Sequence, residues 1–478
     1  MHMLSPAPRL IRSSSPFLRH SWQLSRRRFH DVPLLDDLAY RGFIQDVTRP
    51  DALAHALQSK PVTVYSGVDP TASSLHIGHL IPFMTLLHFQ IRGHRIIPLI
   101  GGATGRVGDP SGRLTERQEA DIQQLDDNVA LLTQSVESFF RHAFEYVKRR
   151  LEKDGSPPPS FQSPTVLSNL KWHEKFSMLD FLRDVGKQVR VNTMLNRESV
   201  RARLESQHGL SFTEFTYQLL QAYDFYHLHK HYGCNVQVGG SDQWGNIVAG
   251  LELIGRHETP SNTSASESSA YGLTTPLLTT SSGEKFGKSA GNAVWLNPNL
   301  TSVFDFYQYF IKVTDDDVEK YLKLFTFLPR STIDQIVEAH RLAPEKRTAQ
   351  RRLAAEVTEL VHKREGMVRA ETLTKMLFDS DYHGLQAEHI KSALGGDPRL
   401  VLLDFQELQG TPVAKLAAKY GLVSSNSAAK TLVASRGLYL NNQIVPEVQH
   451  MVPSSSLIDD RIAILRAGKG KLLVLVAN

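Results

Sequence analysis

Two histidines stand three positions apart around a glycine in the stretch SLHIGHLIPFMTLLHF. His76 and His79 precede an apolar run that predicts a helix, and Ser73 or Ser74 is placed to cap it. A helix N-terminus attracts anions because its free N–H groups and its dipole face outward. Gly78 would let a ligand approach the backbone closely. The pair therefore predicts a phosphate site, with ordinary surface or core histidines as the plainer alternative.

A second stretch, GEKFGKS at 283–289, places Lys285 and Lys288 on a glycine-flanked loop. Lysines on such a loop can neutralise the charge that builds on departing pyrophosphate, and they need to be in place only in the transition state. Alone, this string is common on protein surfaces. Together with the two histidines at one sheet edge, it favours a nucleotide site.

Four short segments of β-branched or aliphatic residues each run into a loop of small or polar residues, at 61–71, 95–105, 235–244 and 275–289. Helical periodicity lies between them, which predicts a doubly wound, Rossmann-like α/β domain with a mostly parallel sheet. In such sheets ligands bind outside the carboxyl ends of the strands. We therefore expect these four loops to meet at one site.

A further group of polar residues has helical spacing. Tyr217, Gln221 and Asp224 follow one another at i, i+4 and i+7, so a helix puts all three on one face. A core stripe would show the same spacing. Three polar side chains are nevertheless costly to bury unless a ligand or partner satisfies them.

After 297–302 the strand signal gives way to helices. The segment 344–366 predicts a helix that begins at Pro344 and buries an apolar stripe. Its first turns carry a cluster of cations: Lys346, Arg347, Arg351 and Arg352. Cations there oppose the helix dipole, so we expect that helix stability is not their role. A solvated face and a phosphate-contacting face are both open.

The segment 411–445 predicts two helices, closed by Gly421 and Gly437, and then a hairpin around an Asn-Asn turn. Basic residues stud the two helices: Lys415, Lys419, Lys430 and Arg436. A compact helix, helix and hairpin unit with basic helices is typical of an RNA-binding module.

Residues 1–30 contain six arginines, several serines and no acidic residue. This composition indicates a mitochondrial transit peptide, with a basic tail or nucleic-acid arm as the alternative. Without these arginines the 54 basic residues fall to 48 against 49 acidic ones, so a nucleic-acid surface must be a local patch. Cys234 is the sole cysteine, which excludes an intramolecular disulfide and a multi-cysteine zinc site. No apolar run is long enough to span a bilayer.

The ordered motifs YSGVDPTASSLHIGH, GGATGRVGDPSGR, FTEFTYQLLQAYDF, GGSDQWGN and KFGKS resemble class I aminoacyl-tRNA synthetases, specifically the tyrosyl-tRNA synthetase family of bacterial and mitochondrial type. The resemblance covers about residues 31–478. It implies a reaction in which tyrosine and Mg-ATP give tyrosyl adenylate, and in which tRNA(Tyr) then takes the acyl group. No protein nucleophile is needed.

The resemblance also implies a role for individual residues. The tyrosine-binding positions are Tyr65, Thr104, Asp109, Tyr217, Gln221, Asp224 and Gln237. The ATP-binding positions are Ser66, Asp69, Gly78, Arg113, Arg117, Asp242, Gln243, Lys285, Lys288 and Ser289. The positions that stabilise the reacting phosphates are Thr71, His76, His79, Lys285 and Lys288.

The expected organisation follows from the same resemblance. A transit peptide (1–30) precedes a class I catalytic domain with a connecting insertion (31–298), a helical anticodon-binding domain (299–408) and a small α+β S4-like RNA-binding domain (409–478). ATP with Mg²⁺ is a substrate, and no permanently bound metal or organic cofactor is expected. The family further implies a homodimer in the mitochondrial matrix, with no membrane contact.

Two rival functions stay open at this point. A tryptophanyl-tRNA synthetase shares the fold and both signatures, but the pair Asp224 and Tyr65 argues against it because an indole offers only a donor. A role in group I intron splicing would need structured basic insertions. The segments 152–164 and 257–272 are instead rich in proline or serine and weakly charged.

Overall fold

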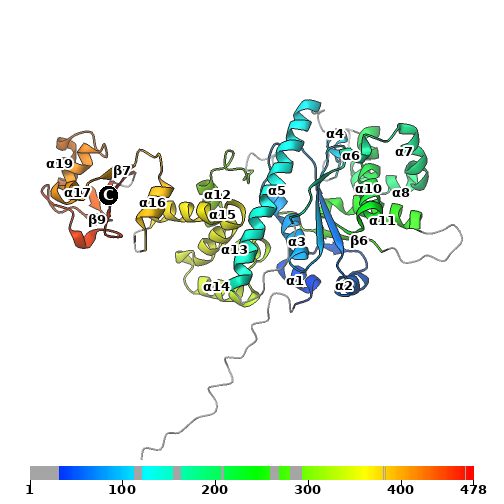
Figure 1. Cartoon of the computed structure of the whole chain (residues 1–478), viewed down its shortest axis with the longest axis horizontal. Coiled ribbons are helices and arrows are strands. Elements are labelled where there is room, and N and C mark those ends of the chain that lie inside the picture. Colours follow the sequence, from blue (N-terminus) through cyan, green and yellow to red (C-terminus); the bar gives the residue numbers. More distant parts are fainter. Residues whose placement is uncertain are drawn as a thin grey trace, which may run out of the picture.

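The computed structural model describes residues 32–111, 121–153, 163–205, 209–258, 269–279, 293–379, 382, 384–468 and 470–478 (Figure 1). Several sequence-based expectations fall elsewhere. The predictions that fall outside the described ranges concern the leader 1–30, most of both insertions, and Arg113, Arg117, Lys285, Lys288 and Ser289.

A six-stranded sheet in the order β1-β6-β5-β2-β3-β4 forms the centre of the first half of the chain. The strands are β1 (Asp46–Val47), β2 (Thr63–Val68), β3 (Arg95–Ile100), β4 (Leu167–Ser168), β5 (Cys234–Gly240) and β6 (Tyr271–Thr275). All neighbours pair in parallel except β1, which is antiparallel to β6. The expected Rossmann-like parallel sheet is confirmed.

The fourth expected strand is displaced. The segment 275–289 was predicted to begin with a strand, whereas β6 ends at Thr275, where that prediction starts. Pro276 follows directly and has no N–H to donate, so the ladder cannot continue through it.

Helices cover both faces of the sheet (Figure 1). The long helices are α3 (Leu80–Gln90), α5 (Ile122–Lys153), α10 (Phe212–Tyr232) and α11 (Trp244–Glu258). The shorter ones are α1 (Leu34–Arg41), α2 (Pro50–Ser59), α4 (Thr104–Val107), α6 (Leu170–His173), α7 (Met178–Asp184), α8 (Val191–Leu195) and α9 (Glu198–Leu204). Helix α3 is apolar all round and almost wholly buried, because the sheet covers one side and the next helices the other.

A helical region follows the sheet. Its helices are α12 (Val303–Ile311), α13 (Asp315–Phe325), α14 (Arg330–Leu342), α15 (Thr348–Phe378) and α16 (Ala387–Ala393). The helix expected from Pro344 differs at its start, since 344–346 forms a 3-10 turn and α15 begins after Arg347, whose φ is 50°. One hydrophobic core runs from Leu34 through the sheet to Ala370, so the boundary expected at 298 does not separate two cores.

A second, five-stranded sheet in the order β7-β11-β10-β8-β9 lies at the far end of the molecule (Figure 1). Its strands are β7 (Leu400–Leu403), β8 (Leu438–Leu440), β9 (Gln443–Ile444), β10 (Ile462–Ala467) and β11 (Lys471–Ala477). The helices beside it are α17 (Phe405–Gly410), α18 (Val413–Lys419) and α19 (Asn426–Ala434). Strand β7 precedes the boundary expected at 408 yet pairs with β11, so this unit begins earlier than expected.

The predicted helix, helix and hairpin are present in that unit. Asn441 and Asn442 form the turn with φ of 47° and 65°. The second helix closes differently from the expectation, because Arg436, and not Gly437, takes the positive φ of 55°. A search of the described helices for one with the length and hydropathy of a membrane span finds none.

Candidate active site

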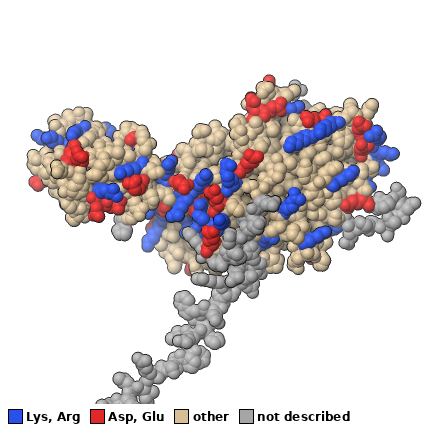
Figure 2. Space-filling model, viewed as in Figure 1, with Lys and Arg blue, Asp and Glu red and all other residues tan. Residues whose placement is uncertain are grey.

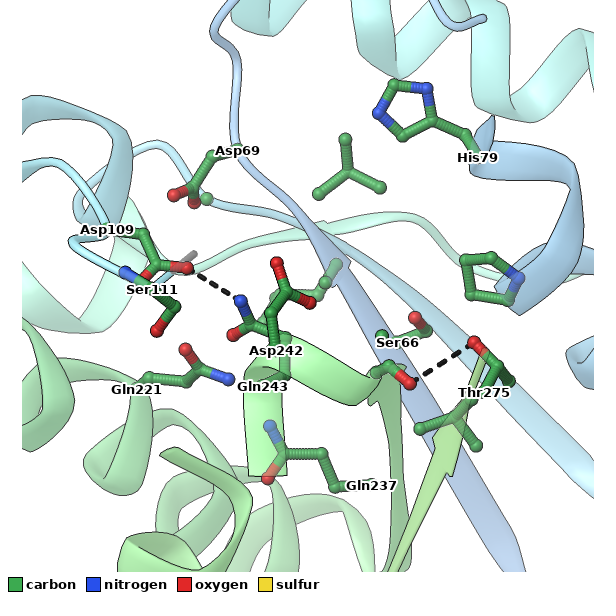
Figure 3. A pocket seen from close by; sticks show the side chains of 18 of the residues that line it. Ser66, Asp69, His79, Asp109, Ser111, Gln221, Gln237, Asp242, Gln243 and Thr275 are labelled. Carbon is green, nitrogen blue, oxygen red and sulfur yellow. Dashed lines mark hydrogen bonds between the residues drawn. The ribbon is translucent and has the colours of Figure 1, made fainter. Parts of the chain in front are cut away.

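A cavity of about 460 Å³ opens at the carboxyl ends of β2, β3, β5 and β6 (Figure 3). Among the residues predicted from sequence, those that line it are Tyr65, Ser66, Asp69, Thr71, His76, Gly78, His79, Thr104, Asp109, Tyr217, Gln221, Asp224, Gln237, Asp242 and Gln243. Residues 275–278 also contribute. The expected meeting of four loops is therefore confirmed for the part of the chain that the structure describes.

The two histidines cap the turn that leads into α3. The main-chain N–H of Gly78 donates to Nδ1 of His76 at 3.1 Å, and the N–H of His76 donates to Nδ1 of His79 at 3.0 Å. The prediction that Ser73 or Ser74 caps this helix is wrong. Both serines lie in a bend, and His76 after them is extended and pairs with Trp295, so the helical turn begins later than the serines.

This capping fixes the tautomer of both imidazoles. Because each Nδ1 accepts a hydrogen bond, the proton of the neutral ring sits on Nε2, and Nε2–H is the donor. A Cβ on Gly78 would lie 2.9 Å from Cε1 of His76, so glycine is needed for the ring to pack on the backbone. Two N–H donors at a helix start are suited to phosphate oxygens.

Tyr65 also lines the cavity; it is 1% exposed and its hydroxyl has no hydrogen-bond partner among the described residues. Burial raises the pKa of the Tyr65 phenol, and the nearby Asp224 raises it further, so the group stays protonated. A buried hydroxyl without a partner is costly. A ligand with a polar group at this position would satisfy it.

Three side-chain donors hold the Asp224 carboxylate in place. Oδ1 accepts from Nε1 of Trp172 at 2.8 Å and from Nε2 of His173 at 2.7 Å, while Oδ2 accepts from Nδ2 of Asn169 at 2.9 Å. All three donors lie on or just before α6, which follows the short strand β4. The sequence pattern does not single them out, because a two-residue strand carries too little periodicity.

Hydrogen bonds connect Asp69 with other residues that line the cavity. Asp69 accepts from the Thr104 hydroxyl at 2.7 Å and from the Tyr217 hydroxyl at 2.9 Å. Burial raises the pKa of Tyr217, and the charge of Asp69 adds to this, so Tyr217 donates. A Cβ on Gly101 would lie 2.0 Å from Oδ1 of Asp69, which explains glycine there. Asp69, assigned to the ribose by resemblance, thus contacts two residues assigned to tyrosine.

The side wall of the cavity is an amide network (Figure 3). Nε2 of Gln243 donates to Asp109 at 2.7 Å, and Nδ2 of Asn246 donates to Gln221 at 3.0 Å. The buried Oε1 of Gln237 has no partner among the described residues. Asn246 was not predicted, although it belongs to the GGSDQWGN motif. This wall offers oxygens to a cation such as an ammonium group.

The basic cluster at the start of α15 is largely engaged within the chain. Arg347 donates to the carbonyls of Ile311 at 2.6 Å and Val313 at 2.9 Å. It therefore stabilises the carboxyl end of α12, and the expectation that this cluster serves no helix is wrong for Arg347. Two other members of the cluster form ion pairs, Arg351 with Asp379 and Arg352 with Glu356. Lys346 is exposed to solvent.

The predicted cations of the C-terminal unit are mostly exposed. Lys415, Lys430 and Arg436 lie in solvent, whereas Lys419 pairs with Glu407. Figure 2 shows basic and acidic side chains intermixed on this face of the molecule. Any nucleic-acid surface here is thus a local patch, as the near-neutral charge balance predicts.

Comparison with known proteins gives consistent matches. The profile of the tRNA synthetases class I (W and Y) matches residues 57–379. The mitochondrial tyrosine–tRNA ligase of Saccharomyces cerevisiae is 42% identical over 450 residues, which cover 92% of this chain and 88% of the relative. The tyrosine–tRNA ligase of Lactiplantibacillus plantarum is 42% identical, with 91% and 97% covered. A C-terminally truncated mitochondrial tyrosyl-tRNA synthetase of Aspergillus nidulans superposes with a TM-score of 0.64 at 38% identity, over 74% of this chain and 95% of that chain.

Proposed function

This chain belongs to the class I tRNA synthetases of the tryptophan and tyrosine group, and we propose that its cavity joins tyrosine to tRNA(Tyr). The activity is that of a tyrosine–tRNA ligase. The tyrosine carboxylate attacks the α-phosphate of ATP, pyrophosphate leaves, and the terminal ribose of tRNA then displaces AMP from the adenylate. One observation supports this above all: a single cavity is lined both by the two capped imidazoles and by Tyr65 and Asp224.

The phenol end accounts for selection of the amino acid. The substrate hydroxyl donates to Asp224 and accepts from Tyr65, whose own hydroxyl has no partner among the described residues. Tyrosyl-tRNA synthetases are themselves the standard illustration of this effect, in which phenylalanine leaves buried polar groups unpaired. An indole N–H could donate to Asp224 but could not accept from Tyr65.

The residues that line the cavity can hydrogen-bond to the ammonium group of tyrosine and to the phosphates of ATP. Asp109, Tyr217 and Gln221 offer oxygens to the ammonium group, with Gln237 and Thr104 beside them. The Nε2–H groups of the two histidines and the Thr71 hydroxyl face the phosphates. The residues assigned to the ribose and adenylate are Ser66, Asp69, Gly78, Asp242 and Gln243. The other residues that the resemblance assigns to ATP lie outside the described residues: Arg113, Arg117, Lys285, Lys288 and Ser289.

ATP enters as its Mg²⁺ complex, and the metal leaves with pyrophosphate. Catalysis in this scheme is positioning and charge stabilisation, because the nucleophile is the substrate carboxylate itself. The donors from His76 and His79 act where charge develops on the α-phosphate and the leaving group.

For tRNA, the exposed cations are the best supported contacts: Lys346, Lys415, Lys430 and Arg436. The cations already engaged within the chain would have to exchange partners on binding: Arg347, Arg351, Arg352 and Lys419. The splicing alternative gains no support, since both insertions lie mostly outside the described residues.

A homodimer is supported by an apolar patch on α7, α8 and the start of α10. Leu179 is 79% exposed and Phe212 is 70% exposed, and Met178 and Val191 are also largely in solvent. Several large apolar side chains in solvent mark a surface that a partner covers. Localisation in the mitochondrial matrix is supported by the arginine-rich leader and by the mitochondrial relatives.

Pyrophosphate exchange with ATP tests the activation step. We expect exchange that depends on tyrosine, and exchange driven by tryptophan in its place would contradict the substrate assignment. His79→Ala should slow adenylate formation while the KM for tyrosine changes little, because His79 lies in the turn before α3, whereas Tyr65 and Asp224 belong to β2 and α10. A matching loss of tyrosine affinity would mean that the ring only supports the fold.

A further inference from the structure

A titratable side chain outside the predicted set, His173, lies directly behind the phenol end of the cavity. It is the last residue of α6, and its side chain is 7% exposed. Its Nε2 is 2.7 Å from Oδ1 of Asp224, and the edge of its ring meets Tyr223 at 5.6 Å between centroids. A buried imidazole in this position can orient the Asp224 carboxylate directly through a hydrogen bond.

The partners of Asp224 fix the direction of this hydrogen bond. Trp172 can only donate, and it already donates to Oδ1. The amide of Asn169 donates to Oδ2 from the other side. An ionised carboxylate accepts at both oxygens, so His173 takes its place as the second donor to Oδ1. Oδ2 accepts one hydrogen bond from the described residues and keeps a lone pair for the substrate phenol.

We propose that His173 is a positioning residue for tyrosine selection: by donating to Oδ1, it fixes the plane of the Asp224 carboxylate so that Oδ2 faces the substrate hydroxyl. The torsion that turns a carboxylate is soft. Trp172 on Oδ1 and Asn169 on Oδ2 each hold one oxygen, and the second donor on Oδ1 narrows the rotation that these two contacts leave. This inference rests on the proposed function of Asp224 as the phenol acceptor. It adds to that function a residue that makes no substrate contact.

The experiment compares His173→Leu with His173→Gln in the full-length protein. Leucine fills a similar volume and excludes water but cannot donate, whereas glutamine carries an N–H near the position of Nε2. We expect His173→Leu to raise the KM for tyrosine about ten- to a hundredfold, the loss typical of one hydrogen bond to a charged group. Selectivity for tyrosine over phenylalanine should fall by a similar factor. The KM for ATP should stay within about twofold of the wild-type value, and His173→Gln should recover most of the loss.

Three results would overturn the proposal: an unchanged tyrosine KM and selectivity in His173→Leu, an equal rise in the KM for ATP, or an equal loss in His173→Gln. If His173→Leu does not fold, His173→Asn, whose amide is too short to reach Asp224, provides the same comparison.

Asp224→Ala, which removes the acceptor altogether, separates this inference from the function on which it rests. If Asp224→Ala leaves tyrosine selectivity intact, Asp224 is not the phenol acceptor and both proposals fail. If it destroys selectivity while His173→Leu does not, the phenol site stands and the role of His173 alone is refuted.

Discussion

The imidazoles at the start of α3 are held by main-chain N–H groups, so their orientation depends on the backbone between them. Gly78 supplies that backbone, and a Cβ there would lie 2.9 Å from Cε1 and 3.0 Å from Nδ1 of His76. These distances are too short for the ring to stay in place. Any side chain at this position must displace the capping imidazole.

We therefore expect Gly78→Ala to slow adenylate formation about a hundredfold, as a displacement near 1 Å can do. The KM for tyrosine should hardly change, since Tyr65 and Asp224 belong to other elements. Rapid-quench measurement of adenylate formation tests this. Gly255→Ala is the matched control, because a Cβ there meets nothing within 4 Å. A rate equal to wild type in Gly78→Ala would refute the capping argument.

At this scale the sequence predicts the residues that face the ligand better than those that support them. Helical spacing singles out Asp224 together with Tyr217 and Gln221, and the family resemblance adds Tyr65. Both miss Asn169 and His173, since β4 is two residues long and its ladder is set by β3 rather than by its own pattern. A short strand that is stabilised by a neighbour distant in sequence shows no periodicity of its own, so the residues that follow it cannot be predicted from the sequence pattern.

At the scale of elements, α15 contains a break that its sequence does not announce. His362 has φ of −111°. Lys363 has φ of 63° with ψ of 175°, a backbone region that residues other than glycine rarely occupy. Nδ1 of His142, from α5, donates to the Val361 carbonyl at 2.9 Å, which satisfies an acceptor at the break. The periodicity of 344–366 predicts a continuous helix because that contact comes from more than 200 residues away.

The break buries His362 against Phe306, with 4.8 Å between ring centroids. Burial lowers the pKa of His362 to about 4, and the charge of His142 acts in the same direction. The unfolded chain binds a proton near the ordinary pKa of about 6.5, and the folded chain does not. Stability is therefore lost as pH falls from about 6.5 to about 4, by at most about 3 kcal/mol from this group.

We expect His362→Leu to have a shallower fall in Tm over that pH interval than the wild type. Thermal unfolding between pH 7 and pH 4.5 measures it. The exposed His389, changed to Leu, is the control and should follow the wild type. Parallel curves for His362→Leu and wild type would mean that His362 does not titrate in this range.

At the scale of the whole molecule, the apolar patch on α7 to α10 predicts association through that face. Phe212→Asp together with Leu179→Asp should place charges in the interface and give a monomer in sedimentation equilibrium. The matched control is Leu342→Asp, which alters an equally exposed leucine on α14. If the double variant stays dimeric, the dimer interface lies on another face of the molecule.

The C-terminal unit has its own core, which argues that it can be removed without disturbing the cavity. The hydrophobic packing around α16 determines where the chain should be truncated. Ile390 of α16 and Leu394, just after that helix, share a hydrophobic cluster with Ile464 and Val474 of the second sheet, so α16, which also contacts α15, should be removed together with that sheet. A truncation at 411, the edge of the RNA-binding module read from sequence, would leave α16 uncovered.

We thus expect deletion of 380–478 to leave a folded protein that keeps tyrosine-dependent pyrophosphate exchange and loses tRNA charging. The loss follows because three of the exposed cations proposed to contact tRNA, Lys415, Lys430 and Arg436, are removed while the cavity is intact. Deletion of 411–478 should lose charging too but aggregate more readily, since the apolar face of α16 meets water. Light scattering and exchange assays on both truncations decide this. Loss of exchange in the longer deletion would make the C-terminal unit part of the catalytic core.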